Sequence, residues 1–245
     1  MGEIPARASW VTYVRCHDDI GWAVTDEDAA SVGWGGAAHR AFLNEFYRGA
    51  FPSSFARGAL FQHNEATGDA RISGSAASLC GVESALEHDD PTALDLAVSR
   101  LELLYAVVFS YGGVPLVYMG DELGLLNDHT WEADPARRDD NRWMHRPRMD
   151  WEAAGRRHAP DTVEGRIWAG LTQLAAKRRS TRAVHAQGTS EPLWTGNDHV
   201  FALRREHAGE RMLLLANFSA AGQTVPAGIV AEALTLEPYG FRWIV

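Results

Sequence analysis

Apolar and polar positions alternate along this chain in blocks that predict a mixed α/β fold. Residues 10–15 are rich in β-branched and aromatic side chains, which is typical of a strand. Residues 114–119 are mostly apolar, which suits a parallel strand buried on both faces. Between them, residues 91–111 carry apolar side chains at helical spacing. We expect parallel neighbouring strands at 10–16 and 114–119, with a helix over 91–111.

A second long helix follows over residues 162–180. Asp161 is expected to cap it, because Glu164 stands three residues further on in a capping-box pattern. Asp90 and Pro91 give a similar start to the first helix, as cap and first helical residue. The order strand, helix, strand, helix predicts a parallel sheet with covering helices.

Two polar segments interrupt this order. Residues 23–90 are rich in glycine and acidic residues, contain a short helical stretch over 37–48, and resemble an insertion without a core of its own. Residues 121–150 are too long for an ordinary connection, so a functional loop is expected there.

The pattern changes again after residue 183. Short β-like runs at 199–205, 211–217 and 241–245 are separated by Gly, Asn and Ala, which predicts an antiparallel C-terminal module. The boundary is expected near 181–187.

Composition narrows the classes of partner. The net charge of −9 argues against nucleic acid or an acidic membrane surface. No apolar run has membrane-spanning length, and no signal peptide is visible. The two cysteines give no disulfide framework, so the cytoplasm is the expected compartment, with secretion left open. Nine tryptophans fit either sugar stacking or ordinary packing.

The candidate chemistry follows the first strand directly, at His17, Asp18 and Asp19. Barrel enzymes place their active sites just past the C-terminal ends of parallel strands. There an imidazole can donate to a sugar hydroxyl, and a carboxylate can stabilise positive charge at an anomeric carbon. Taken alone, the triplet also fits a solvated turn or a metal-ligand cluster. No metal-ligand spacing is strong elsewhere, so we expect neither a metal nor another cofactor.

Residues 13–22, which read YVRCHDDIGW, resemble the amylosucrase form of the fourth signature region of the alpha-amylase family. The resemblance implies that His17 and Asp18 contact the donor sugar, with Asp18 as transition-state stabiliser, and that Asp19 lies near the acceptor side. Cys16 replaces a small residue and is given no role. The implied reaction is a retaining transfer of glucosyl from sucrose to an alpha-glucan.

The resemblance continues through residues 25–74, which are similar to the loop that amylosucrases insert after barrel strand seven. It implies that Arg71 faces the fructosyl or acceptor unit, and that Arg40 and Phe42 line the glucan path. Without the resemblance, surface salt bridging is the simpler interpretation of both arginines.

Residues 112–122 resemble strand eight of the family and the loop after it. Asp121 and Glu122 are not expected to form a catalytic pair, because adjacent residues of an extended chain point in opposite directions. Residues 141–147 resemble the loop before helix eight, which implies that Arg142 forms a salt bridge at the pocket floor. Its family partner, an early-barrel Asp, is expected to be absent from this chain.

The resemblance therefore implies the C-terminal part of a (β/α)8 barrel followed by an antiparallel β domain. The expected segments are strand seven (1–22), an inserted subdomain (23–90), helix seven to helix eight (91–182) and the β domain (183–245). Retaining chemistry needs two carboxylates about 5 Å apart, which the family carries on barrel strands four and five.

Those strands have no counterpart in these residues, so the chain is expected to be inactive alone and to need the missing N-terminal half of the barrel. Three alternatives stay open: a sucrose hydrolase, a trehalose-synthase-like enzyme of the same family, or a non-catalytic carbohydrate-binding remnant.

Overall fold

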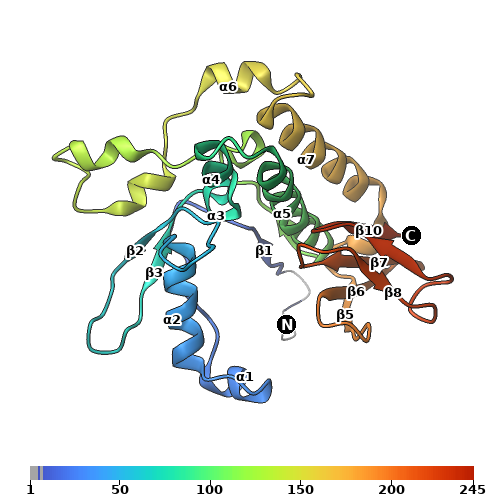
Figure 1. Cartoon of the computed structure of the whole chain (residues 1–245). Coiled ribbons are helices and arrows are strands. Elements are labelled where there is room, and N and C mark those ends of the chain that lie inside the picture. Colours follow the sequence, from blue (N-terminus) through green and yellow to red (C-terminus); the bar gives the residue numbers. More distant parts are fainter. Residues whose placement is uncertain (1–4, 6–7) are drawn as a thin grey trace. The chain divides into compact units, whose positions relative to one another are not determined.

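The computed structural model describes residue 5 and residues 8–245, and it divides into two compact units. The first unit contains the chain up to Val14 together with Val98–Val117 and Gly155–Val245. The second unit contains Arg15–Ala97 and Tyr118–Ala154. The fold is α/β with an antiparallel sheet at the C-terminal end (Figure 1). The four-segment division made from the sequence stays a prediction.

A two-stranded parallel sheet lies in the first unit. Strand β1 (Val11–Thr12) pairs with β4 (Val114–Pro115), which confirms the predicted parallel neighbours. Both strands are much shorter than predicted, because a strand extends only as far as its ladder partner. The prediction that residues 114–119 are buried on both faces is wrong: Val114 is 55% exposed. Its own helices cover this sheet too little to bury the apolar run.

The two long helices agree with the prediction: α5 spans Pro91–Ser110 and α7 spans Val163–Ser180. Asp90 caps α5 as expected, with its carboxylate accepting the Ala93 N–H at 2.9 Å. The predicted cap of α7 is wrong by one residue. Thr162, not Asp161, is the N-cap, because its hydroxyl accepts the Gly165 N–H at 3.0 Å.

A glycine turn joins α5 to β4. Gly112 and Gly113 have φ angles of 96° and 77°, in the left-handed region that favours glycine. The guanidinium of Arg205 lies against Gly112, and a methyl group there would stand 2.5 Å from its Nη2. Arg178 donates to the carbonyls of Phe109 and of Gly113, the latter at 2.7 Å. The half-buried Arg178 and the buried Arg205 therefore tie this turn to α7 and to the C-terminal sheet.

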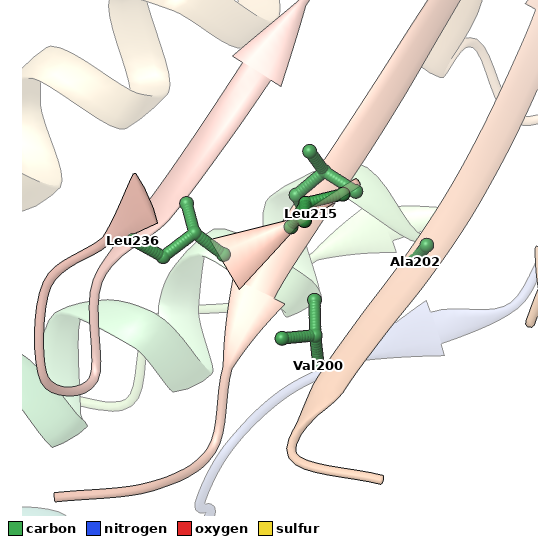
Figure 2. Packing of buried hydrophobic residues seen from close by; sticks show 5 residues of the cluster. Val200, Ala202, Leu215 and Leu236 are labelled. Carbon is green, nitrogen blue, oxygen red and sulfur yellow. The ribbon is translucent and has the colours of Figure 1, made fainter. Parts of the chain in front are cut away.

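The C-terminal sheet confirms the predicted antiparallel module. Its four strands run in the order β10-β7-β6-β5. They are β5 (Thr189–Leu193), β6 (Val200–His207), β7 (Glu210–Asn217) and β10 (Phe241–Ile244), and a separate pair is formed by β8 (Gln223–Val225) and β9 (Leu234–Leu236). The two sheets share a core. Figure 2 draws this cluster and labels four of its members, and the full cluster is Val200, Ala202, Leu215, Val225 and Leu236. A 3-10 turn, η4 (Arg182–Val184), links α7 to the sheet.

The second unit is built from short elements. In chain order they are α1 (Asp26–Ser31), α2 (Gly36–Tyr47), β2 (Ala59–Phe61), β3 (Arg71–Ser73), α3 (Ala76–Cys80), α4 (Val82–Glu87), the 3-10 turns η1 (Asp121–Leu123), η2 (His129–Ala133) and η3 (Asn141–His145), and α6 (Trp151–Arg156). Helix α2 matches the predicted helical stretch. Every residue of α3 is buried, within a unit to which residues 118–154 also belong. Small side chains there allow close backbone packing that hydropathy alone does not indicate. The prediction that residues 23–90 have no core of their own stays a prediction.

Within the described part of the chain, none of the helices combines the length and apolar character that a membrane crossing requires.

Candidate active site

The backbone that follows β1 is fixed from both sides in the second unit. Arg15 is 2% exposed, and its Nε donates to the Gly74 carbonyl at 2.7 Å. The carbonyl of His17 accepts from Arg146 Nε at 2.7 Å. His145 Nε2 lies 3.2 Å from the same carbonyl oxygen. These bonds set the position from which Asp18 and Asp19 extend.

His145 is held as a neutral imidazole. Its Nδ1 accepts the Gly74 N–H at 3.2 Å, so Nε2 must carry the proton that it donates to the His17 carbonyl. Burial, together with the nearby positive charge of Arg15, lowers the pKa of His145 to about 3. The ring therefore supports the strand tip and carries no charge at neutral pH.

Arg142 pairs with two carboxylates. Its Nη1 donates to Asp18 Oδ1 at 3.0 Å, while its Nε and Nη2 reach the two oxygens of Asp140 at 2.9 and 2.8 Å. The hydrogen bond from Arg142 lowers the pKa of Asp18 to about 2 and also lowers the pKa of Asp140. Arg142 therefore has carboxylate partners within this chain, while the absence of the family's early-barrel Asp stays a prediction. Asp140 caps η3 two residues before Arg142, which places its carboxylate within reach.

A second ion pair lies beside the first. Asp19 Oδ2 accepts from Arg71 Nη1 at 3.2 Å. The Asp19 side chain is 4% exposed, whereas that of Arg71 is 54% exposed. Strand pairing aligns Arg71 with Phe61, and the Phe61 ring lies 4.8 Å from the guanidinium carbon of Arg142. The hairpin of β2 and β3 thus brings both arginines to the Asp18–Asp19 segment.

A cavity of about 620 Å³ adjoins this segment. Arg71 and Arg40 both line it, and Trp22 forms part of its wall. Arg40 also donates to the Val24 carbonyl at 2.9 Å and to Asp26 at 3.0 Å. The cavity is compatible with the predicted role of Arg40, although its bonds are those of a structural salt bridge.

Phe42 lies apart from Arg40. It lines a separate cavity of about 320 Å³ with Trp34 and His39, and it is 37% exposed. Residues two positions apart on a helix face different directions, so α2 presents the two side chains to different spaces. The structure does not place Arg40 and Phe42 along one path as the resemblance implied.

Asp121 and Glu122 take structural positions. The Glu122 carboxylate accepts the Gly120 N–H at 2.8 Å, and Asp121 is 4% exposed. Gly120 has a φ of 96°, so this bond supports a left-handed turn. The two carboxylates are not arranged as an acid and a nucleophile.

The chemistry available at the segment is that of charge stabilisation. Asp18 is exposed and ionised, and it is oriented by Arg142, which suits a carboxylate that stabilises a cationic sugar. A proton donor needs a raised pKa. The hydrogen bonds from Arg142 lower the pKa values of both Asp18 and Asp140. Among the described residues, no group of three or more His, Cys, Asp or Glu side chains is placed to hold a metal ion.

Three contributors were missed by sequence reasoning. Asp140 could have been found, because an Asp two residues before a polar turn is a common cap. Phe61 and His145 could not, because their positions depend on the β2–β3 pairing and on burial.

Comparison with known proteins gives a consistent set of similarities. No family model matches the chain. Over 185 residues the chain is 27% identical to trehalose synthase from Thermus thermophilus, a match that covers 58% of this chain and 19% of that protein. The chain thus spans about a fifth of the length of this relative.

Solved structures with a similar arrangement act on or bind sugars, by their titles. A cyclic alpha-maltosyl-(1→6)-maltose hydrolase from Arthrobacter globiformis is 23% identical, with a TM-score of 0.46 over 69% of this chain and 40% of that one. The D415N mutant of trehalulose synthase MutB is 19% identical, with a TM-score of 0.48 over 60% and 38%. AmyP in complex with maltose is 13% identical, with a TM-score of 0.48 over 60% and 34%.

Proposed function

We propose that this chain forms the donor-sugar wall of a retaining transglucosidase of the alpha-amylase family. The observation that carries the proposal is Asp18, which is exposed, ionised and hydrogen-bonded to Arg142. The neighbouring His17 backbone is held by a hydrogen bond from Arg146. An oxocarbenium-like transition state is stabilised by a fixed carboxylate at such a position. The similarity to trehalose synthase, 27% identity over 185 residues, also supports the family.

Five of the predicted residues have a role in this proposal. Asp18 is the transition-state stabiliser and His17 donates to a ring hydroxyl. Asp19 and Arg71 bind the acceptor side as a pair, since Arg71 remains half exposed. Arg142 orients Asp18.

The reaction that we propose is transfer of glucosyl from sucrose to an alpha-glucan, as in amylosucrases. The second aspartate, Asp19, and the long segment between the two parallel strands support this choice over simple hydrolysis. The nucleophile and the general acid would come from protein outside these residues, which accords with the lowered pKa values of Asp18 and Asp140. The proposed compartment is the cytoplasm.

Two further functions are supported by particular observations. The similarity to trehalose synthase favours an isomerase of the same family. The arginine-bound Asp18 and Asp140, with their lowered pKa values, favour a carbohydrate-binding role for these 245 residues by themselves.

Product analysis distinguishes these functions. The protein is expressed from the gene together with any open reading frame that precedes this segment. It is incubated in one reaction with sucrose and maltotriose, and in a second reaction with maltose. Transfer gives fructose together with longer glucans, hydrolysis gives equal glucose and fructose, and isomerisation gives a new disaccharide without free fructose. Release of no product from sucrose, with conversion of maltose to trehalose instead, would overturn the amylosucrase-like assignment.

A further inference from the structure

A second cavity lies in the first unit, in the groove between α5 and α7. Its volume is about 570 Å³, within the range of small-molecule sites. Two of its walls are helices, 20 and 18 residues long, and the connection between α6 and α7 completes it with Arg157 and His158. The polar and aromatic side chains that line it include Ser99, Glu102, Arg157, His158, Arg166 and Trp168.

Two features show that the groove is shaped around Glu102. A methyl group on Gly170 would stand 2.3 Å from Glu102 Oε1, so the carboxylate has room only because α7 carries glycine there. Burial raises the pKa of Glu102, while the positive charge of Arg166 opposes the shift. A half-buried carboxylate therefore faces the cavity beside a guanidinium.

Trp168 forms an aromatic wall of the same cavity. The guanidinium carbon of Arg157 lies 5.7 Å from the indole centroid. The His158 ring meets the indole edge-on, with centroids 6.2 Å apart and an interplanar angle of 89°. These contacts restrict the indole, and a fixed aromatic surface costs a ligand little conformational entropy on binding.

The charges in the groove select the class of ligand. An anion would meet the carboxylate of Glu102, and a cation would meet Arg157 and Arg166. A hydroxyl group both donates and accepts, so it can hydrogen-bond to a carboxylate and to a guanidinium group alike. From this geometry we propose that the α5–α7 groove binds a neutral, polyhydroxylated ligand, a short gluco-oligosaccharide, at a site separate from the Asp18 segment.

The proposal rests on the proposed function only for the choice of glucose units as the probe. All of its residues belong to the first unit, whereas Asp18, Asp19, Arg71 and Arg142 belong to the second. Substitutions in either set therefore report on one site at a time.

The test is calorimetric titration of the full chain with maltotriose. The chain is fused to a soluble partner protein that binds no sugar. Trp168→Leu removes the aromatic wall and is expected to weaken binding at least tenfold. Glu102→Gln keeps the shape of the side chain and is expected to weaken it at least threefold. Asp139→Asn, at an exposed position outside both sites, is the control and is expected to leave this binding unchanged. Asp18→Asn reports whether the sugar binds at the Asp18 segment instead, and thermal melting verifies that each variant is folded.

Each outcome either supports or overturns sugar binding in the α5–α7 groove. Loss of binding in the Trp168 and Glu102 variants but not in Asp18→Asn supports the groove. Loss in Asp18→Asn alone assigns the sugar to the Asp18 segment, which overturns the groove and leaves the proposed function standing. No binding by the wild type overturns the groove, while fructose release from sucrose tests the proposed function separately. Binding of inorganic phosphate in competition with maltotriose would make the groove an anion site.

Discussion

Arg142 lowers the pKa of Asp18 through one hydrogen bond, and it donates its other hydrogen bonds to Asp140. Lysine is a point charge and cannot bridge two carboxylates in this planar arrangement. Arg142→Lys is therefore expected to raise the pKa of Asp18 from about 2 toward the ordinary carboxyl value. Carbon-13 NMR titration of the Asp18 side-chain carboxyl measures this pKa in the wild type and in the variant. An Asp18 pKa that stays near 2 in the variant would show that Arg142 is not the cause.

His145 gives the second residue-scale prediction, which concerns stability against pH. The folded-state pKa is lowered from 6.5 to about 3, so below pH 6.5 the unfolded chain binds a proton that the folded chain does not. This contribution to stability is complete above pH 6.5 and is lost as the pH falls toward 3. The loss is at most about 1.4 kcal/mol per pH unit.

Urea unfolding at several pH values measures the effect, with His145→Gln as the comparison. Glutamine does not titrate, yet its amide can still donate to the His17 carbonyl. The variant is expected to show a shallower fall in stability between pH 6.5 and 4 than the wild type. Identical slopes would mean that His145 is protonated in the folded state.

The sequence predicts local motifs at this scale but not their partners. The His17–Asp19 segment was singled out because it follows a strand, and its role was assigned through the family resemblance. The pairing of Arg142 with Asp140 was not predicted. Contacts of Asp18 with Arg142, 124 residues away, depend on how the chain folds back. Such long-range contacts leave no periodic signal in one sequence.

At the scale of elements, helix and strand types followed from periodicity, while strand lengths did not. Helices α5 and α7 and the C-terminal strands agree with the predictions, because each has a continuous apolar stripe or alternation. Strands β1 and β4 are two residues long, since pairing and not composition sets their length. The short helices α3 and α4 were missed because their small side chains give a weak pattern.

The α5–β4 turn gives an element-scale prediction. Gly112→Ala places a methyl group in a left-handed conformation and against the Arg205 guanidinium. Gly209→Ala is the matched control, because its φ of 77° carries the same conformational cost but nothing lies within 4 Å of the added methyl. We expect Gly209→Ala to lower the free energy of unfolding by about 1 kcal/mol, and Gly112→Ala to lower it by more than twice that amount. Chemical denaturation compares the two, and equal losses would mean that the Arg205 contact is not required.

Exposed apolar side chains of the first unit are expected to make the whole molecule associate in solution. Apolar side chains of its parallel sheet are strongly exposed, and their exposed fractions are 47% for Trp10, 54% for Val11, 55% for Val114 and 38% for Leu116. An open sheet edge with such a face promotes association. We expect the isolated chain to bind a hydrophobic dye such as ANS and to aggregate at micromolar concentration.

Lysine substitutions test the origin of this behaviour. Val114→Lys combined with Leu116→Lys is expected to reduce dye fluorescence and the aggregated fraction seen in light scattering. Ile244→Lys, at an exposed position of β10, is the control and is expected to change neither. If the control variant improves solubility as much as the pair does, the parallel sheet is not the responsible surface.

The role of Asp18 is tested most directly by its turnover number. Asp18→Asn keeps the size of the side chain and removes its charge. Asp139→Asn is the control, because Asp139 is an exposed carboxylate close to Arg142 in the sequence. Sucrose-dependent fructose release is measured for both variants in the protein expressed with its preceding reading frame. Removing one transition-state stabiliser costs about 10²–10³-fold in kcat, so Asp18→Asn is expected to fall by at least 100-fold while Asp139→Asn stays within about twofold. An Asp18→Asn variant that retains more than a tenth of the wild-type kcat would contradict the account.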